Sequence, residues 1–288
     1  MNQSASSVWD RLEMNITTWA AKEHGIAAAV AVGSRVRQDP PADEWSDLDV
    51  ILFMDNPASH VNRTDWVAEI GEPLLAIPGR TANNDPERRV IFSGGYNVDF
   101  VFLPIAAVDW LTQNGTQIEP FGRGARVLVD KDGRLQKLFP PNQPLAEMQT
   151  NPPPSPADFE RAVLSFWYAA YNTARMLRRG DLWAARGTDN QLKETLASIL
   201  ALHALVVGKQ KDVWYRGRFM QQWADPQALA ELPQTFWHYD QGDAWRALLT
   251  TTNLFERLSG EVASSLQYPF PQETTRRMAD MIHALCPA

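Results

Sequence analysis

The segment SDLDVILF, residues 46–53, places two aspartates one residue apart at the start of an apolar run. Successive side chains of a strand point to opposite faces, so we expect Asp47 and Asp49 on one face and Leu48 on the other. Two carboxylates held this close repel each other, and burial increases the cost. The pattern therefore favours a cation between them, and a divalent metal ion is the obvious candidate.

Two further motifs in the first half of the chain can converge with these acids. Gly33 and Ser34 end the strand-like run GIAAAVAVGS, where a small residue lets backbone N–H groups approach a phosphate closely. Asp99 is a lone acid in the apolar run NVDFVFLP, so its burial is costly unless it is paired or bound to a metal. Three carboxylates around Mg²⁺ are suited to in-line attack on a nucleoside triphosphate.

Each of these residues also has a simpler structural explanation. The two aspartates before the strand could merely form a turn, since Asp is a frequent turn residue. Asp99 could belong to a buried ion pair with Arg88 or Arg89. Ser34 could cap a following helix, although a cap and a phosphate site can coincide.

Composition excludes several classes of protein. The chain has 288 residues, of which 44% are hydrophobic and 21% charged, as is ordinary for a globular protein of two domains. Its single cysteine, Cys286, rules out an intramolecular disulfide and a cysteine zinc site. The net charge of −7 argues against a nucleic-acid partner and is compatible with a cationic small molecule.

The N-terminal segment predicts an amphipathic helix and not a targeting sequence. Its apolar residues recur at helical spacing, and no basic region is followed by an apolar one. No apolar stretch reaches the roughly 18 residues that a membrane span needs. We therefore expect a cytoplasmic protein without a membrane partner, and we favour a monomer.

The periodicity of the chain changes after its midpoint. Residues 1–138 alternate helical patterns with strand patterns, which predicts an α/β domain. Residues 139–156 hold seven of the 20 prolines and are expected to form a linker. Residues 157–288 are helical almost throughout, with helices expected at 157–181, 188–208, 219–230, 243–264 and 271–285.

The order of the motifs resembles the nucleotidyltransferase superfamily that includes DNA polymerase beta. Its signature is Gly-Ser, then Asp-x-Asp after some ten to fifteen residues, then a third acid on a neighbouring strand; here Ser34 and Asp47 are 13 positions apart. Longer blocks, among them AVAVGSRVRQDPPADEWSDLDVILF, FWYAAYNTARMLRRGDLWAA and YPFPQETTRRMADMI, resemble the aminoglycoside 6-adenylyltransferases, the streptomycin adenylyltransferases, over nearly the whole chain.

This resemblance implies a nucleotidyltransferase domain with a mixed sheet, followed by a helical substrate-binding domain, with the active site between them. Such enzymes transfer AMP from MgATP to a hydroxyl of the antibiotic and release pyrophosphate. It also implies roles for particular residues: metal ligands and catalytic acids (Asp47, Asp49, Asp99) and a triphosphate-binding turn (Gly33, Ser34, Arg35).

The acceptor side departs from the family pattern. The family tends to have an acid shortly after the block that reads LWAA here, whereas this chain continues Arg186-Gly187-Thr188-Asp189. A cationic acceptor needs carboxylates, and the candidates in the second half are Asp181, Asp189 and Glu194. Two alternatives stay open, namely transfer to another small-molecule or protein hydroxyl, and a non-catalytic nucleotide-binding module such as a toxin–antitoxin-like regulator.

Overall fold

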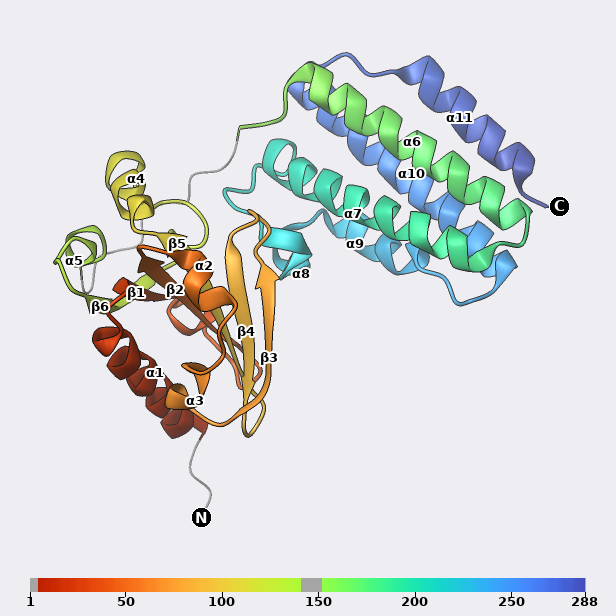
Figure 1. The fold of residues 1–288 in the computed structure, drawn as a ribbon. Helices are drawn as coiled ribbons and strands as arrows, with labels where there is room; N and C mark the ends of the chain where they lie inside the picture. Colours follow the sequence, from red (N-terminus) through yellow and green to blue (C-terminus); the bar gives the residue numbers. More distant parts are fainter. Residues whose placement is uncertain (1–4, 141–151, 288) are drawn as a thin grey trace. The chain divides into compact units, whose positions relative to one another are not determined.

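A computed structural model describes residues 5–140 and 152–287 of the chain. The chain divides into two compact units, residues 1–149 and residues 150–288 (Figure 1). The boundary falls within the proline-rich segment 139–156, most of which (141–151) lies outside the described residues. Each unit is therefore considered separately.

A six-stranded mixed sheet forms the first unit, as the resemblance implied. Its strands are β1 (Ile26–Val32), β2 (Leu48–Met54), β3 (Pro73–Arg80), β4 (Pro86–Phe92), β5 (Tyr96–Pro104) and β6 (Ala125–Asp130). The order across the sheet is β3-β4-β5-β2-β1-β6. Strands β2 and β5 are parallel, and every other neighbouring pair is antiparallel.

Helices cover both faces of the central strands, which explains why β2 is apolar almost throughout. Leu48, Val50 and Leu52 share a buried cluster with residues of α1 (Ala5–Lys22) and α3 (Val67–Ile70). The intervening Ile51 and Phe53 pack with residues of α4 (Ala106–Asn114) and α5 (Leu135–Leu138). The short helix α2 (Pro57–Val61) and the 3₁₀ turn η1 (Gly33–Arg35) complete the elements of this unit.

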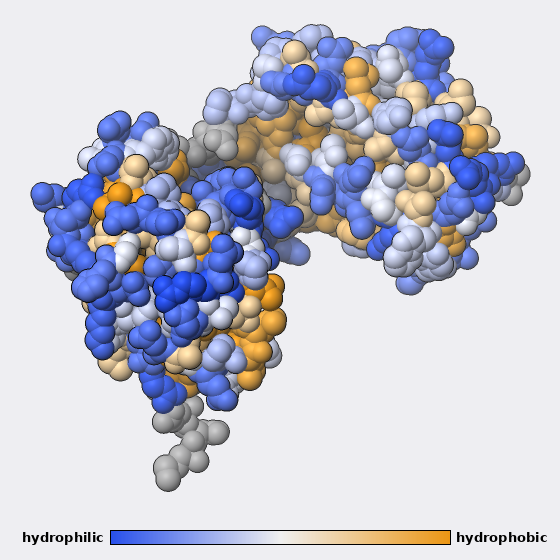
Figure 2. Space-filling model, viewed as in Figure 1, coloured by the Kyte–Doolittle hydropathy of each residue, from blue (hydrophilic) through white to orange (hydrophobic). Residues whose placement is uncertain are grey.

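The β4–β5 hairpin and the edge strand β3 shape the other half of the sheet. Gly94 and Gly95 have φ of 89° and 83°, so they make the tight turn between these strands. Leu74, Leu75 and Ile77 of β3 are exposed, and Figure 2 shows hydrophobic surface where this strand lies. Prolines within β3 limit its pairing with another strand, as is usual at sheet edges.

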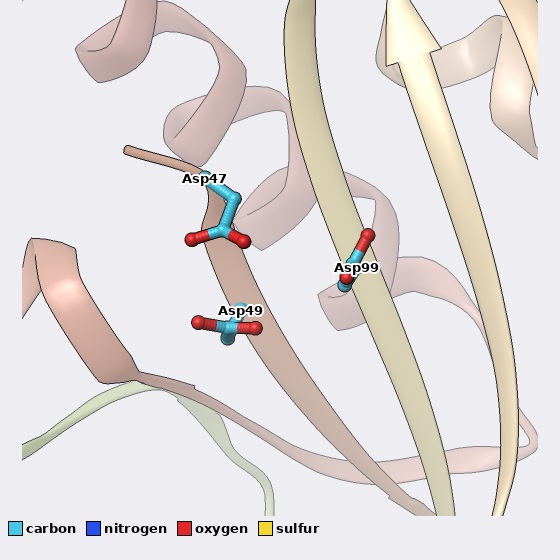
Figure 3. Close-up of side chains that lie close together, drawn as sticks. All are labelled: Asp47, Asp49 and Asp99. Carbon is cyan, nitrogen blue, oxygen red and sulfur yellow. The ribbon is translucent and has the colours of Figure 1, made fainter. Parts of the chain in front are cut away.

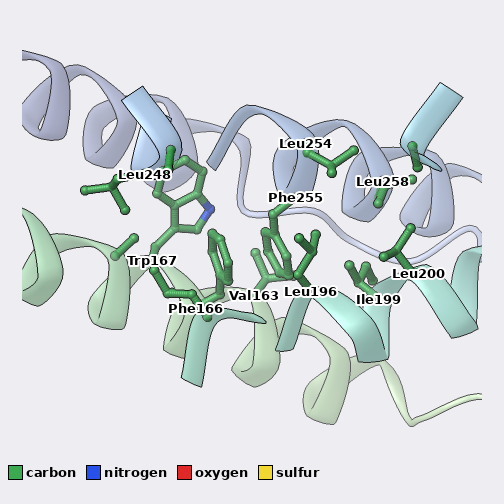
Figure 4. Close-up of a cluster of buried hydrophobic side chains, with 14 of the residues drawn as sticks. Val163, Phe166, Trp167, Leu196, Ile199, Leu200, Leu248, Leu254, Phe255 and Leu258 are labelled. Atoms are coloured by element: carbon green, nitrogen blue, oxygen red, sulfur yellow. The ribbon is translucent and has the colours of Figure 1, made fainter. Parts of the chain in front are cut away.

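The second unit is built from four long helices. These are α6 (Pro156–Arg178), α7 (Leu182–Val206), α10 (Gln241–Leu266) and α11 (Gln272–Leu285). Shorter turns lie between α7 and α10: η2 (Tyr215–Gly217), α8 (Met220–Trp223), α9 (Pro226–Glu231) and η3 (Leu232–Thr235). Figure 4 shows the core that joins α6, α7 and α10, where the rings of Phe166 and Phe255 stack with centroids 3.6 Å apart.

Two helices differ from the expected ranges. Helix α7 begins at Leu182 and not near residue 188, so Gly187 and Thr188 are helical and form no turn. Ala185, near the start of α7, is fully buried. Packing of these first turns in the core therefore outweighs the cost of placing Gly187 in a helix. The single helix expected at 219–230 is two helices, because Ala224 is extended and Asp225 caps α9 directly before Pro226.

Within the described ranges, no helix combines the length and the apolar character that crossing a membrane requires.

Candidate active site

The start of β2 places Asp47 and Asp49 on one face of the sheet. Asp47 directly precedes the strand and Asp49 is its second residue, with the buried Leu48 between them facing the other way. Both aspartates are half-buried. The alternation that the sequence predicts for this segment is therefore present in the structure.

Asp99 joins these two acids from the neighbouring strand. The parallel pairing of β2 with β5 sets Asp99 directly beside Asp49. One carboxylate oxygen from each of Asp47, Asp49 and Asp99 lies within 4.8 Å of the others, as Figure 3 illustrates. Two acids at the start of β2 and a third acid from β5 thus form one cluster, which we call the aspartate cluster.

The environment of Asp99 disfavours its charged form. Burial, together with the negative charges of Asp47 and Glu87, raises the pKa of Asp99 to about 6, although Arg89 and a hydrogen bond from Asn97 act in the opposite direction. Its Oδ1 atom is buried and has no hydrogen-bond partner among the described residues. A carboxylate in this situation is suited to bind either a cation or a proton.

The aspartate cluster fits a divalent metal ion such as Mg²⁺. Carboxylate oxygens are the protein ligands that Mg²⁺ prefers, and a site of this kind leaves further positions for phosphate oxygens. The unpartnered Oδ1 of Asp99 and the mutual repulsion of the three acids would both be relieved by such an ion.

Gly33 and Ser34 lie against the aspartate cluster. Gly33 has a φ of 73°, and a side chain at this position would overlap the Asp49 carboxylate, so only glycine fits here. The buried Ser34 hydroxyl donates a hydrogen bond to the carbonyl oxygen of Asp47, at 3.1 Å. This hydroxyl therefore fixes the approach to β2, and its expected contact with a phosphate stays a prediction.

Arg35 supports the loop that leads into the cluster. Its Nε and Nη2 donate hydrogen bonds to the carbonyl oxygen of Ser46, at 3.1 and 2.6 Å. The guanidinium also lies 3.5 Å from the ring centroid of Trp9, and burial lowers the pKa of Arg35 while Asp47 raises it. These contacts give Arg35 a structural task besides the triphosphate contact that the resemblance implies.

The three candidate acids for the acceptor have different environments on α7. Asp189 is buried; its carboxylate accepts hydrogen bonds from Lys193 Nζ at 2.5 Å and from Trp237 Nε1 at 2.8 Å. Asp181 is exposed, precedes the helix and pairs with Arg179 at 3.2 Å, and Glu194 is an exposed helix residue. Within the described ranges these acids form no carboxylate cluster like that of the first unit.

Glu87 and Arg89 were not among the predicted site residues. Arg89 is the direct neighbour of Asp99 in the antiparallel pairing of β4 with β5, and it forms an ion pair with Glu87. The sequence suggests Arg89 only as an ion-pair partner of Asp99. The Gly94-Gly95 turn fixes the hairpin register, so counting residues outward from that turn would have placed Arg89 beside Asp99.

A mixed sheet that carries a Gly-Ser turn and three clustered aspartates has the site architecture of a nucleotidyltransferase. The family model for streptomycin adenylyltransferase matches residues 10–285, and the chain belongs to this family of nucleotidyltransferase enzymes.

Two curated relatives agree with this assignment. An aminoglycoside 6-adenylyltransferase of Bacillus subtilis (strain 168) is 22% identical over 263 residues, which span 88% of this chain and 89% of the relative. An aminoglycoside 6-adenylyltransferase of Campylobacter jejuni is 22% identical over 264 residues, which span 89% of this chain and 88% of the relative.

Two solved structures are also similar to the chain. The crystal structure of an aminoglycoside 6-adenyltransferase from Bacillus subtilis has a TM-score of 0.43 and 18% identity, covering 98% of this chain and 99% of that one. A nucleotidyltransferase-like protein from Exiguobacterium sibiricum has a TM-score of 0.38 and 13% identity, covering 90% and 78%.

Proposed function

We propose that this protein transfers AMP from ATP to a hydroxyl group of a streptomycin-like aminoglycoside, in the presence of Mg²⁺, and releases pyrophosphate. The observation that supports this most directly is the aspartate cluster beside the Gly33-Ser34 turn, in a chain that the family model matches over residues 10–285. A purely nucleotide-binding module has no need for all three acids at this spacing.

Asp47, Asp49 and Asp99 are the residues that would hold Mg²⁺. When bound, the ion binds phosphate oxygens and neutralises part of their charge. Gly33 leaves room for the Asp49 carboxylate to lie against η1, and we expect backbone N–H groups of this turn to contact a phosphate held at the aspartate cluster. These residues together orient the triphosphate for in-line attack at its α-phosphorus.

The reaction that we propose forms one bond and breaks one bond. The acceptor hydroxyl oxygen bonds to the α-phosphorus, and the bond from that phosphorus to the bridging oxygen of pyrophosphate breaks. The hydroxyl proton passes to the Asp99 carboxylate, on the oxygen that does not hold the ion.

The cationic acceptor is expected to bind to carboxylates of the helical unit. Glu194 is exposed, and so is Asp181, although Asp181 also pairs with Arg179. Asp189 would first have to release Lys193 or Trp237, and we propose that it contributes by fixing these two side chains. An exposed carboxylate paired with an ammonium or guanidinium group provides selectivity for cationic acceptors.

The test is incubation of the protein with MgATP and a panel of aminoglycosides while pyrophosphate release is followed. We expect release to depend on an aminoglycoside, with streptomycin among the active ones. If release occurs with other alcohols or with a protein and not with any aminoglycoside, the chemistry holds and the acceptor assignment fails. If ATP binds and no acceptor stimulates release, the protein is a nucleotide-binding module.

A further inference from the structure

Arg89 lies in the same row of the sheet as two members of the aspartate cluster. The parallel register pairs Asp49 with Asp99, and the antiparallel register pairs Asp99 with Arg89. Residues directly opposite each other on neighbouring strands point to the same face. Arg89 therefore extends from the face that carries the acids, one strand away from Asp99.

A buried carboxylate anchors this arginine. Glu87 precedes Arg89 by two residues on β4, so both point to the same face, and the two side chains form an ion pair. The Glu87 side chain is 6% exposed, whereas that of Arg89 is 50% exposed. In this ion pair the Glu87 side chain is therefore buried, and the Arg89 side chain is accessible to a ligand.

The neighbouring edge strand leaves space for this anchor. Gly79 on β3 is the register partner of Glu87, and a Cβ atom at Gly79 would lie 2.8 Å from Glu87 Oε1. A side chain at residue 79 would therefore displace the carboxylate. Because an unpaired buried carboxylate is costly, the ion pair stabilises Glu87 and holds Arg89 beside it.

An arginine in this position is suited to bind a phosphate. Its side chain is longer than that of aspartate, and half of it is exposed. The planar guanidinium has several N–H donors, and the ion pair with Glu87 through Nη2 leaves others for an anion. A phosphoryl group held over the aspartate cluster is the anion that the proposed reaction brings to this face.

We propose that Arg89, anchored by Glu87, binds a non-bridging oxygen of the phosphoryl group that is transferred. This inference rests on the proposed function, because it needs a nucleotide phosphate at the aspartate cluster. The competing explanation is that Arg89 only balances the charge of Asp99 and touches no substrate.

Kinetics of Arg89→Ala provide the first test, with Arg126→Ala as the matched control. Arg126 belongs to the same sheet, is similarly exposed at 46% and pairs with Glu13 of α1, away from the proposed chemistry. We expect Arg89→Ala to lower kcat about 100-fold, as loss of one transition-state hydrogen-bond donor does, and to bind MgATP about 10-fold more weakly. Free guanidine should restore part of the activity, whereas Arg126→Ala should stay within about twofold of the parent.

The two diastereomers of ATP with sulfur on the α-phosphorus distinguish contact from charge balance. If Arg89 binds one non-bridging oxygen, its removal should change the ratio of kcat/KM for the two diastereomers about 10-fold, because only one of them has sulfur at that position. If Arg89 only balances Asp99, both diastereomers should lose activity equally, and this result would overturn the proposal.

A second variant guards against misfolding. Arg89→Ala leaves Glu87 buried without its cation, so Glu87→Gln/Arg89→Met removes both charges together. We expect this double variant to unfold at the parent's temperature, to have a kcat about 100-fold lower than the parent, and to show no rescue by guanidine, because the methionine side chain occupies the space. If the parent itself transfers no AMP, the proposed function fails, and MgATP binding alone then decides: an unchanged Kd in both Arg89 variants would refute the role of Arg89.

Discussion

The properties of Asp99 depend on residues that are distant in the sequence. Burial raises its pKa, Asp47 from the start of β2 and Glu87 from β4 raise it further, and Arg89 opposes them. The sequence identifies Asp99 as a costly acid in an apolar strand, which is correct. It does not reveal the size or the sources of the effect, because these follow from the pairing of β5 with two neighbours.

Replacing Asp49 with Asn tests the metal site at the level of one residue. The substitution is nearly isosteric, so the fold should persist, but one anionic ligand is lost. We expect the transfer rate to fall at least about 1000-fold, which corresponds to about 4 kcal/mol of transition-state stabilisation. Asp55→Asn, at an exposed acid just after the same strand, serves as the control and should keep full activity. Transfer by the Asp49 variant within about threefold of the parent would refute the metal assignment.

The raised pKa of Asp99 predicts a pH dependence of stability. The pKa of Asp99 is about 6 in the folded state, whereas its ordinary pKa, expected in the unfolded state, is 3.8. The folded protein therefore binds this proton more tightly than the unfolded chain. Its contribution to stability is therefore fully present below about pH 4 and is lost as the pH rises through about 6. Asp99→Asn should remove this dependence.

Urea unfolding in EDTA across pH 4 to 8 measures this effect. The asparagine variant should be the more stable protein at pH 7.5, and the difference should shrink as the pH falls. Equal stability of variant and parent throughout the range would show that the charge of Asp99 is already neutralised in the folded protein.

Among the elements, strands were easier to predict from the sequence than helix ends. The strand patterns around residues 48–55 and 97–104 match β2 and β5 closely, because apolar strands between turns have clear limits. The start of α7 was predicted six residues too late, since Gly187-Thr188 suggests a turn. The helix begins earlier because its first turns pack in the same core as α6 and α10. The sequence alone does not show this packing.

The position of Asp189 within α7 changes what its mutation should do. Burial lowers the pKa of Lys193, and Asp189 is the acid that opposes this effect. Asp189→Ala would leave Lys193 without its counter-charge, at a side-chain exposure of only 13%, so we expect a loss of about 3 kcal/mol in the free energy of unfolding. Chemical denaturation measures this loss. An unchanged stability with a raised acceptor KM would instead identify Asp189 as a direct acceptor contact.

Glu194 on the same helix should behave in the opposite way. It is exposed, so Glu194→Gln should change the free energy of unfolding by less than about 0.5 kcal/mol. If it pairs with the cationic acceptor, the KM for the aminoglycoside should rise about 10-fold while the KM for ATP stays constant. Steady-state kinetics with each substrate varied in turn provide the comparison, and equal shifts of both constants would exclude Glu194 from the acceptor site.

At the scale of the whole molecule, the chain consists of two units with separate hydrophobic cores. The first unit has one buried cluster on each face of its sheet, and the core of the second unit lies between α6, α7 and α10. We expect residues 1–149 alone to fold and to bind MgATP, since that unit contains the aspartate cluster, but to transfer no AMP. Calorimetry of the fragment measures binding, and full transfer activity would show that the helical unit is dispensable.

In the proposed reaction the AMP moiety of ATP is transferred to an aminoglycoside. The most direct measurement uses ATP labelled either on the α-phosphorus or on the γ-phosphorus, incubated with Mg²⁺, streptomycin and the protein. We predict that the α label appears on the antibiotic and the γ label in pyrophosphate, and that Asp49→Asn abolishes both. A γ label on the antibiotic, or no α label on any aminoglycoside of the panel, would contradict the proposed function.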